Sequence, residues 1–439
     1  MAQGPRQHRR RVVITGMGIV CPLGHDVATV WKAVLAGASG ADWITIFDAS
    51  TYPTKFDAEV KGFDLRGFLA DPTAHLTGNR ACQFAVAAAV QACRQAGIDI
   101  ETNDPRDGID RKRLGIYLGS GEGSVDNKTF FSAIAQSWDQ DSGTMDWVRW
   151  ARIALESQDP VNTREQEPHM PSWHIAVLTG ARGPARSCLT ACAASTQAVG
   201  EAMMMIRSGR ADVVIAGGCH SMIHPMGVMG FNRLTALSTK NEDPRTASRP
   251  FSGTRDGFVI GEGAGILVLE SLESARRRGA RVLAEIVGYG TSADAFRVTD
   301  MHETGRGPIQ AMQAALKDAG LGPEQIDYIN AHGTGTIEND QIETLAIKAV
   351  FGDRRVPVSS VKGAMGHLIA AAGAAEIICC VMALQDQLIP PTANLYDVDS
   401  RLDLDYVPLR PRPARLVHIM KESFGFGGQN NVVIIKRYQ

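Results

Sequence analysis

Short apolar runs alternate with helix-like segments along the whole chain, and this alternation restricts the possible folds more than any other feature. Strands separated by helices predict an α/β protein with a mostly buried sheet. Strands are expected at residues 11–16, 114–119, 212–217, 282–289, 327–331, 356–361, 416–421 and 431–436, with two short strands within 257–269. Helices are expected at residues 25–36, 80–97, 192–208, 307–320, 340–351 and 366–384.

The second half of the chain repeats this order and suggests a duplication. Ala92–Ile98 (ACRQAGI) is similar to Ala315–Leu321 (ALKDAGL), and each segment ends a helix and leads through a polar connection to a strand. We therefore expect two similar halves, residues 11–272 and 273–439. Residues 1–10 are polar and basic and lack the apolar core of a signal peptide, so they are expected to form a disordered leader.

Composition excludes several classes of protein. The chain has 439 residues, of which 44% are hydrophobic, and this is enough for a large core. Its net charge of −2 shows no bias toward nucleic acid or a membrane surface. The eight cysteines form no CxxC pair and no cluster with zinc spacing, so we expect a reduced, cytoplasmic protein without a metal site. The most apolar run, residues 368–384, is interrupted by Gly373 and Glu376, and no membrane span is expected.

Residues 123–168 depart from the alternation and are interpreted as an insert. The segment contains several acidic residues, and one face at helical spacing carries Trp147, Trp150, Ala151, Ala154 and Leu155. We interpret this face as part of a surface helix that packs on its own body. The alternative is a contact surface for a partner subunit.

Cys192 lies in a run of small residues, Thr190–Ser195 (TACAAS), that leads into a helix-like segment. At the start of a helix the partial positive charge would favour a thiolate, and small neighbours would let an acyl group approach. The alternative is a buried structural thiol, which the residue type alone favours. Motifs farther along the chain, described below, make the nucleophile the preferred interpretation of Cys192.

Two histidines follow apolar strands in glycine-rich settings. His332 lies in NAHGTGT at residues 330–336, and His367 ends KGAMGH at residues 362–367. Open α/β sheets place their sites at the carboxyl ends of strands, so both histidines are candidate site residues. A further glycine-rich loop, SFGFGGQN at residues 423–430, carries two aromatic side chains.

Other glycine-rich motifs do not indicate nucleotide binding. The pairs Gly16/Gly18 and Gly261/Gly263 each lack the third glycine of the dinucleotide fingerprint. The sequence also contains no Gly-Lys-Ser/Thr phosphate loop, so we expect no nucleotide chemistry.

Taken together, TAC at 190–192, AHGTGT, KGAMGH and SFGFGGQN resemble the four signatures of the condensing enzymes. The chain is similar to the elongating 3-oxoacyl-[acyl-carrier-protein] synthases of the synthase I/II type over about residues 10–437. The resemblance implies the thiolase fold, an α/β fold with two pseudo-duplicated halves in a five-layer αβαβα sandwich. It also implies decarboxylative condensation of malonyl-carrier protein with a cysteine-bound acyl chain, in fatty-acid or type II polyketide elongation.

The resemblance assigns catalytic roles to a small set of residues. Cys192 would take the acyl chain as a thioester, and His332 and His367 would hold the enolate oxygen formed by decarboxylation. Lys362 would lie near the second histidine and tune the charge of the site. The backbone N–H groups of Cys192 and Phe426 would form the oxyanion hole, and Phe426 would also act as a gate.

Further residues have supporting roles by the same resemblance. Asp340 and Glu376 would orient the charged network, and Phe424 would support it. Thr334 and Thr336 would bind the phosphopantetheine arm of the carrier protein. That arm carries the substrates, and no tightly bound cofactor is implied.

The implied partner is an acidic acyl carrier protein, and Arg207, Arg210 and Arg233 are candidates for its contact. The chain would form a homodimer, or a heterodimer with a related ketosynthase subunit, and neither nucleic acid nor a membrane is implied. The alternative function is a non-catalytic or chain-length partner subunit, a class that lacks the cysteine. A degradative thiolase would need a second catalytic cysteine near the loop at 423–430, where the chain has Gly-Phe-Gly-Gly.

Glu122 departs from the family pattern. It lies in GSGEG, residues 119–123, near where family members carry an apolar residue that lines the acyl tunnel. A carboxylate that faces an alkyl chain is costly unless it is paired. Either Glu122 turns away, or the tunnel accepts a less saturated or more polar chain, so ordinary fatty-acid elongation and specialised polyketide or polyene elongation both stay open.

Overall fold

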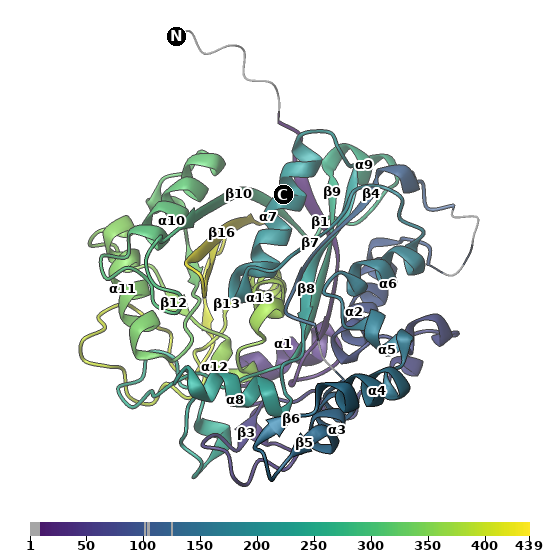
Figure 1. The fold of residues 1–439 in the computed structure, drawn as a ribbon. Helices are drawn as coiled ribbons and strands as arrows, with labels where there is room; N and C mark the ends of the chain where they lie inside the picture. The colour runs from purple at the N-terminus through teal and green to yellow at the C-terminus, as the bar shows by residue number, and fades with distance from the viewer. Residues whose placement is uncertain (1–8, 101, 103–105, 124–125) are drawn as a thin grey trace.

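The computed structural model describes residues 9–100, 102, 106–123 and 126–439 (Figure 1). Most of the expected leader, residues 1–8, lies outside this description. Its last two residues are tied to the folded body, because Arg9 lies 2.5 Å from Asp318 and Arg10 lies 2.6 Å from Asp212. The expectation of a disordered leader is therefore wrong for Arg9 and Arg10.

Ten strands form one continuous mixed sheet. The first half of the chain supplies β1 (Val12–Val20), β4 (Leu114–Ser120), β7 (Ala185–Cys188), β8 (Val213–His220) and β9 (Gly263–Ser271). The second half supplies β10 (Ala284–Ala293), β11 (Tyr328–Asn330), β12 (Val358–Ser359), β15 (His418–Gly425) and β16 (Gln429–Lys436). The order is β12-β11-β15-β16-β10-β1-β9-β8-β4-β7, and β1 and β10 pair antiparallel where the halves meet.

Strand order demonstrates the duplication. Numbered within its own half, each set of five strands runs 3-2-4-5-1 toward the junction of β1 with β10. The directions also agree: β4 is parallel to β7 and β8, just as β11 is parallel to β12 and β15. The remaining pairs of each half are antiparallel. The two halves therefore share one topology.

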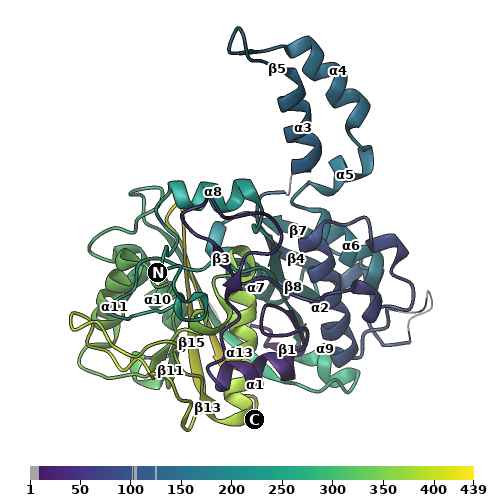
Figure 2. The same cartoon turned by 90° about the horizontal axis from the view of Figure 1, so that it is seen from below.

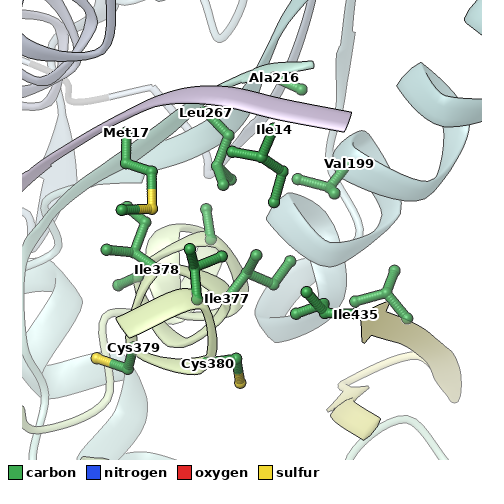
Figure 3. Close-up of a cluster of buried hydrophobic side chains, with 14 of the residues drawn as sticks. Ile14, Met17, Val199, Ala216, Leu267, Ile377, Ile378, Cys379, Cys380 and Ile435 are labelled. Carbon is green, nitrogen blue, oxygen red and sulfur yellow. The ribbon is translucent and has the colours of Figure 1, made fainter. Parts of the chain in front are cut away.

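Helices divide the molecule into five layers. In the first half α2 (Arg80–Ala96) and α6 (Met170–Thr179) cover the outer face, and in the second half α10 (Arg306–Ala319) and α11 (Ile337–Phe351) do so. Between the two halves of the sheet lie α7 (Ala194–Arg207) and α13 (Ala372–Asp386), which contact strands of both halves and each other. This is the expected αβαβα arrangement. Figure 3 shows side chains of β1, α7, β9, α13 and β16 meeting in the central layer.

The segment Ile369–Asp386 is long and apolar enough to cross a membrane by length and composition alone, contrary to the expectation from Gly373 and Glu376. In the fold, however, 83% of it is buried. A helix between two sheets has no solvent-facing side, so it is apolar all round. Its composition is therefore explained by its place in the central layer.

Two local expectations are wrong. Residues 366–384 do not form one helix, because Ile369 takes a left-handed φ of +48° and a short turn, η7 (Ile369–Ala371), precedes α13. Residues 257–269 do not form two strands, because only β9 is regular there and residues before it make isolated bridges. The smaller elements are α1 (Val27–Leu35), α8 (Pro225–Arg233), α9 (Leu272–Arg277), α12 (Lys362–Met365), β2 (Asp42–Trp43), β3 (Phe56–Asp57), β13 (Leu388–Ile389) and β14 (Arg412–Pro413).

The two similar segments, residues 92–98 and 315–321, lie at matching helix–strand contacts in the two halves. A Cβ at Gly16 of β1 would lie 2.0 Å from the carbonyl oxygen of Ala92 in α2. A Cβ at Gly288 of β10 would lie 2.5 Å from the carbonyl oxygen of Ala315 in α10. Ala92 and Ala315 are the first residues of the two similar segments. The sequence similarity therefore marks a close approach of helix to strand that occurs in both halves. Gly16 and Gly18 therefore serve packing, which agrees with their failure to complete a nucleotide fingerprint.

Residues 126–166 form an arm that projects from the body (Figure 2). It contains α3 (Asn127–Ser137), the hairpin of β5 (Trp138–Asp139) and β6 (Thr144–Met145), α4 (Trp147–Ser157) and α5 (Pro160–Glu165). Helix α4 packs against α3, while Trp147 is 68% and Leu155 84% exposed. The interpretation of this segment as a surface helix on its own body is wrong, because periodicity predicts a helix without saying what the helix faces.

The close helix–strand contact makes Gly16 intolerant of any side chain. We expect Gly16→Ala to lower the free energy of unfolding by about 3 kcal/mol, because the new methyl group would meet backbone, which cannot rotate away. Gly67→Ala is the matched control, since a Cβ at Gly67 meets nothing within 4 Å. Urea denaturation of both variants measures the difference, and equal stability would contradict this account of the contact.

Candidate active site

Cys192 lies at the middle of a strained turn, η4 (Ala191–Ala193), directly before α7. Ala191 takes a left-handed φ of +47°, which matches the +48° of Ile369 in η7 before α13. Such conformations in non-glycine residues cost free energy and are often kept at functional sites. In the second half, Ala370 takes the place that Cys192 has in the first, so only one of the two repeated turns carries a thiol.

Cys192, His332 and His367 meet in the fold although they come from different halves. The cysteine sulfur and one ring nitrogen of each histidine all lie within 4.8 Å of one another. The two rings are 5.4 Å apart at an angle of 82°. All three residues are buried and line a cavity of about 290 Å³. The structure thus brings together the three principal residues selected from the sequence.

Both histidines present Nε2 as a hydrogen-bond donor. The backbone N–H of Ile369 donates to Nδ1 of His367 at 3.2 Å, and the Lys362 ammonium lies 3.3 Å from Nδ1 of His332. A neutral imidazole with an accepting Nδ1 carries its proton on Nε2. Nε2 of His367 has no hydrogen-bond partner among the described residues. Two N–H groups are therefore available to one oxygen atom in the cavity.

Burial keeps both imidazoles neutral. Burial lowers the pKa of His332 and of His367 well below the ordinary value, and the Lys362 ammonium lowers both pKa values further. A Cys–His–His set is also a possible metal site by its donor atoms. The ammonium of Lys362, 3.3 Å from a ring nitrogen, opposes a second cation there.

Two buried lysines flank one carboxylate behind the histidines. Lys362 donates to Oε1 of Glu376 and, at 2.5 Å, to the carbonyl oxygen of His332. Lys421 lies 2.6 Å from Oε2 of Glu376 and also contacts Ser423. All of these residues are buried, and the attraction of both ammonium groups to the one carboxylate offsets part of the free energy that burying the charges costs. Lys362 therefore contacts the first histidine directly, whereas the sequence suggested a place near the second.

Lys421 was not selected from the sequence, although the sequence contains a signal for it. Lys421 and Glu422 are charged residues inside the apolar strand that runs from residue 416 into the SFGFGGQN loop. Both are fully buried. Burial and the neighbouring Glu343 raise the pKa of Glu422 well above the ordinary value. Consecutive charges in a buried strand are a sign of an internal network.

Two carboxylates hold the His332 loop from the other side. Glu343 accepts hydrogen bonds from the backbone N–H groups of His332 at 2.6 Å and Gly333 at 2.8 Å. Asp340 accepts from Gly335 at 3.2 Å and lies 3.4 Å from Arg255. Asp340 thus fixes the loop backbone and does not reach the lysines. Glu343 was not selected from the sequence, where it looks like an ordinary residue of a helix.

The remaining predicted site residues line two connected regions around Cys192. Thr334, Thr336 and Phe424 line the 290 Å³ cavity with the histidines, and the Phe424 ring lies 5.9 Å from that of His332. Phe426 lines both this cavity and a second one of about 640 Å³. Glu122 lines the second cavity, and its carboxylate lies 3.8 Å from Nε2 of His220.

The thiol of Cys192 is protonated at neutral pH. Burial raises its pKa to about 11, although Lys362 and the backbone N–H groups of Phe426 and Cys192 lower it. Burial thus outweighs the backbone N–H groups, including the one at the start of the helix, which lower the pKa but do not bring it to neutral pH. The backbone N–H groups of Phe426 and Cys192 both point toward the sulfur, where they can stabilise negative charge on it or on an oxygen atom beside it.

This pKa predicts how Cys192 reacts with iodoacetamide. Only the thiolate reacts, so the rate should rise about tenfold per pH unit between about pH 7 and pH 9, still below the pKa. Mass spectrometry of the labelled peptide measures the rate, and Cys192→Ala supplies the blank. A rate that is constant above pH 7 would show that the thiol is already ionised.

Two family models match the chain. "Beta-ketoacyl synthase, N-terminal domain" matches residues 9–275, and "Beta-ketoacyl synthase, C-terminal domain" matches residues 283–396. The chain is 40% identical over 440 residues to 3-oxoacyl-[acyl-carrier-protein] synthase 2 of Coxiella burnetii, covering 98% of this chain and 99% of that protein. It is 39% identical over 441 residues to the protein of the same name from Vibrio cholerae, with the same coverage.

Solved structures agree with this relationship. The ishigamide ketosynthase/chain length factor has a TM-score of 0.86 and 35% identity, covering 98% of this chain and 100% of that chain. The ketosynthase assembly AntDE:AntF, a type II polyketide acyl-carrier protein in complex with its ketosynthase, has a TM-score of 0.85 and 30% identity at the same coverage. The fold class expected from the sequence is confirmed.

Proposed function

Because the chain belongs to the beta-ketoacyl synthase family, we propose that Cys192, His332 and His367 carry out its condensation reaction. The reaction joins a malonyl unit, with loss of CO2, to an acyl chain in fatty-acid or polyketide elongation. The observation that supports these roles best is the meeting of one thiol and two imidazole Nε2 groups in a single buried cavity.

In the first step the Cys192 sulfur attacks the thioester carbonyl of acyl-carrier protein. The new S–C bond forms as the carrier thiol leaves, and the thiol proton passes to that leaving group. The backbone N–H groups of Cys192 and Phe426 hold the oxyanion, as their effect on the sulfur pKa suggests. The acyl chain extends into the 640 Å³ cavity, which begins at Cys192.

In the second step the malonyl thioester loses CO2. Nε2–H of His332 and of His367 donate to the thioester oxygen and stabilise the enolate that forms. The enolate carbon attacks the Cys192 thioester carbonyl, the C–C bond forms, and Cys192 leaves as a thiolate. Burial, together with the ammonium groups of Lys362 and Lys421, keeps both imidazoles neutral, and a neutral ring with its proton on Nε2 fits this role.

The assignment separates two half-reactions that can be measured independently. Cys192→Ala should lose acyl loading and condensation but still release CO2 from malonyl-carrier protein, because the histidines remain. His332→Ala and His367→Ala should still load acyl groups and lose condensation by about a hundredfold or more, the usual effect of one missing donor. Radiolabelled CO2 release and intact-protein mass spectrometry measure the two steps.

A buried cysteine outside the cavity provides the control. Cys93 lies in α2, and the Cys93→Ala variant should be as active as the wild type. Condensation by Cys192→Ala would refute the nucleophile assignment. A wild-type protein that forms neither an acyl adduct at Cys192 nor a condensation product would instead favour the alternative of a non-catalytic partner subunit, for which the thiol and both histidines have no purpose.

We further propose that the two halves divide these roles. Residues 11–272 carry the nucleophile and residues 273–439 carry the two histidines and the Phe426 loop. Thr334 and Thr336 line the cavity of about 290 Å³, which we call the entrance cavity, and their hydroxyl groups suit the phosphopantetheine arm of a carrier protein. Cytoplasmic location is consistent with eight free cysteines.

Of the three arginines considered for the carrier contact, only two remain suitable. Arg207 is committed to the body, since it donates to Asp318 at 2.6 Å and to the carbonyl oxygen of Val287 at 2.8 Å. Arg210 and Arg233 are exposed. Arg233 is directly followed by Leu234, which lines the entrance cavity, so Arg233 is the better candidate.

We propose that the arm and strand β7 contact a second ketosynthase-fold subunit. Strand β7 is the last strand of the sheet and exposes Ala185 and Arg186, and an open sheet edge is normally covered. The arm leaves the body between β4 and β7 in the chain and exposes Trp147 and Leu155. Two related structures pair a ketosynthase with a chain length factor.

Substitution in the arm tests this contact. Leu155→Asp should shift the protein from dimer toward monomer, because a charge would enter the buried contact, whereas Ser157→Asp at the exposed end of the same helix should not. Light scattering after size exclusion measures the mass. A wild-type protein that is monomeric alone and dimeric only with a related subunit would identify a heterodimer, and a Leu155→Asp protein that still dimerises would contradict the role of the arm.

A further inference from the structure

The cavity that receives the acyl chain has one polar wall. Most of its lining is apolar, as an alkyl chain requires, and includes Leu189, Met222, Met226, Phe231 and Ile369. The exception is the turn after β4, where Ser120, Gly121 and Glu122 reach the cavity. An alkyl chain against this wall would leave polar groups without partners.

Behind this wall lies a small chamber of about 20 Å³, which is room for about one water molecule or one hydroxyl group. Ser120, Gly121 and Glu122 line both the chamber and the acyl cavity, so the two adjoin. His220 and Ser221 also line the chamber. The chamber and the acyl cavity therefore share residues 120–122 as a common wall.

Polar atoms in the chamber lack partners. His220 is 2% exposed, and neither of its ring nitrogens has a hydrogen bond among the described residues. The hydroxyl of buried Ser120 also has none. Buried polar groups are nearly always hydrogen-bonded, and an unsatisfied one calls for an explanation. None of the described residues supplies a partner for these atoms.

Backbone packing holds His220 in this place. A Cβ at Gly121 would lie 1.8 Å from Nε2 of His220, so the ring lies directly on the backbone of residue 121. Burial lowers the pKa of His220 to about 4, and the ring is neutral, with one donor and one acceptor nitrogen. The Glu122 carboxylate, 3.8 Å from Nε2, can only accept hydrogen bonds.

We propose that Glu122, His220 and Ser120 bind a hydroxyl group carried on the distal part of the acyl chain. The proposal rests on the role of Cys192 as the acyl carrier. A hydroxyl group both donates, to the Glu122 carboxylate, and accepts, from His220 or Ser120. A keto group could only accept, and an alkyl chain would satisfy none of these atoms. The substrate class is therefore a hydroxylated acyl chain.

Acyl loading of Cys192 tests the proposal without involving condensation. Carrier-protein thioesters of equal length, with an alkyl, a keto or a hydroxyl group at the distal end, are compared over a series of lengths. Intact-protein mass spectrometry measures the rate of adduct formation. The wild type should load the matching hydroxylated chain about tenfold faster than the alkyl chain, because the alkyl chain leaves buried polar groups unpaired.

Variants link the preference to the chamber. Glu122→Leu should reverse the preference in favour of the alkyl chain, and it should fold, because the Glu122 side chain is 65% exposed at the rim. His220→Gln, which keeps one donor and one acceptor, should retain part of the preference. Glu273→Leu, a substitution of an exposed glutamate on α9, is the matched control and should behave as the wild type.

The outcomes separate this proposal from the catalytic assignment. Equal loading of hydroxyl and alkyl chains by the wild type, faster loading of the keto chain, or a preference unchanged in Glu122→Leu would overturn the proposal. Any of these would leave Cys192 as the acyl carrier. Failure of every chain to form an adduct at Cys192 would instead contradict the proposed function.

Discussion

The close contact between the starts of α7 and α13 is the constraint on which the site depends. A Cβ at Gly373 would lie 2.0 Å from Oγ1 of Thr196, so a glycine is needed for the two helices to touch. The backbone N–H of Ala374 donates to the Ser195 hydroxyl at 3.0 Å and joins them directly. Because each helix follows a strained turn, this contact brings Cys192 of one half to His367 of the other.

Around this contact the molecule buries an unusual number of charges. Glu376 enters the central layer from α13 and is neutralised by Lys362 and Lys421, which come from α12 and β15. Such a network is stable only when complete, because one missing partner leaves a buried charge. Its position behind His332 links the stability of the core to the protonation state of the site.

Much of the fold could be predicted because duplication leaves a signal in local sequence. The similar segments at 92–98 and 315–321 mark matching contacts of α2 with β1 and of α10 with β10. The arm was misjudged because helical periodicity in α4 describes one face and not its surroundings. Lys421 was missed because its partner Glu376 is distant in the chain, and the raised pKa of the Cys192 thiol could not be predicted because burial depends on the whole fold.

The sequence by itself determined the alternation of strands and helices, the duplicated order, and the identity of Cys192, His332 and His367, since these are carried by local pattern and short motifs. Only the tertiary structure decided how those residues meet, which charges support them, and that Glu122 adjoins the unpaired ring of His220. The physical reason is that distances, burial and hydrogen-bond partners arise between segments far apart in the chain. Local pattern contains no record of those long-range contacts.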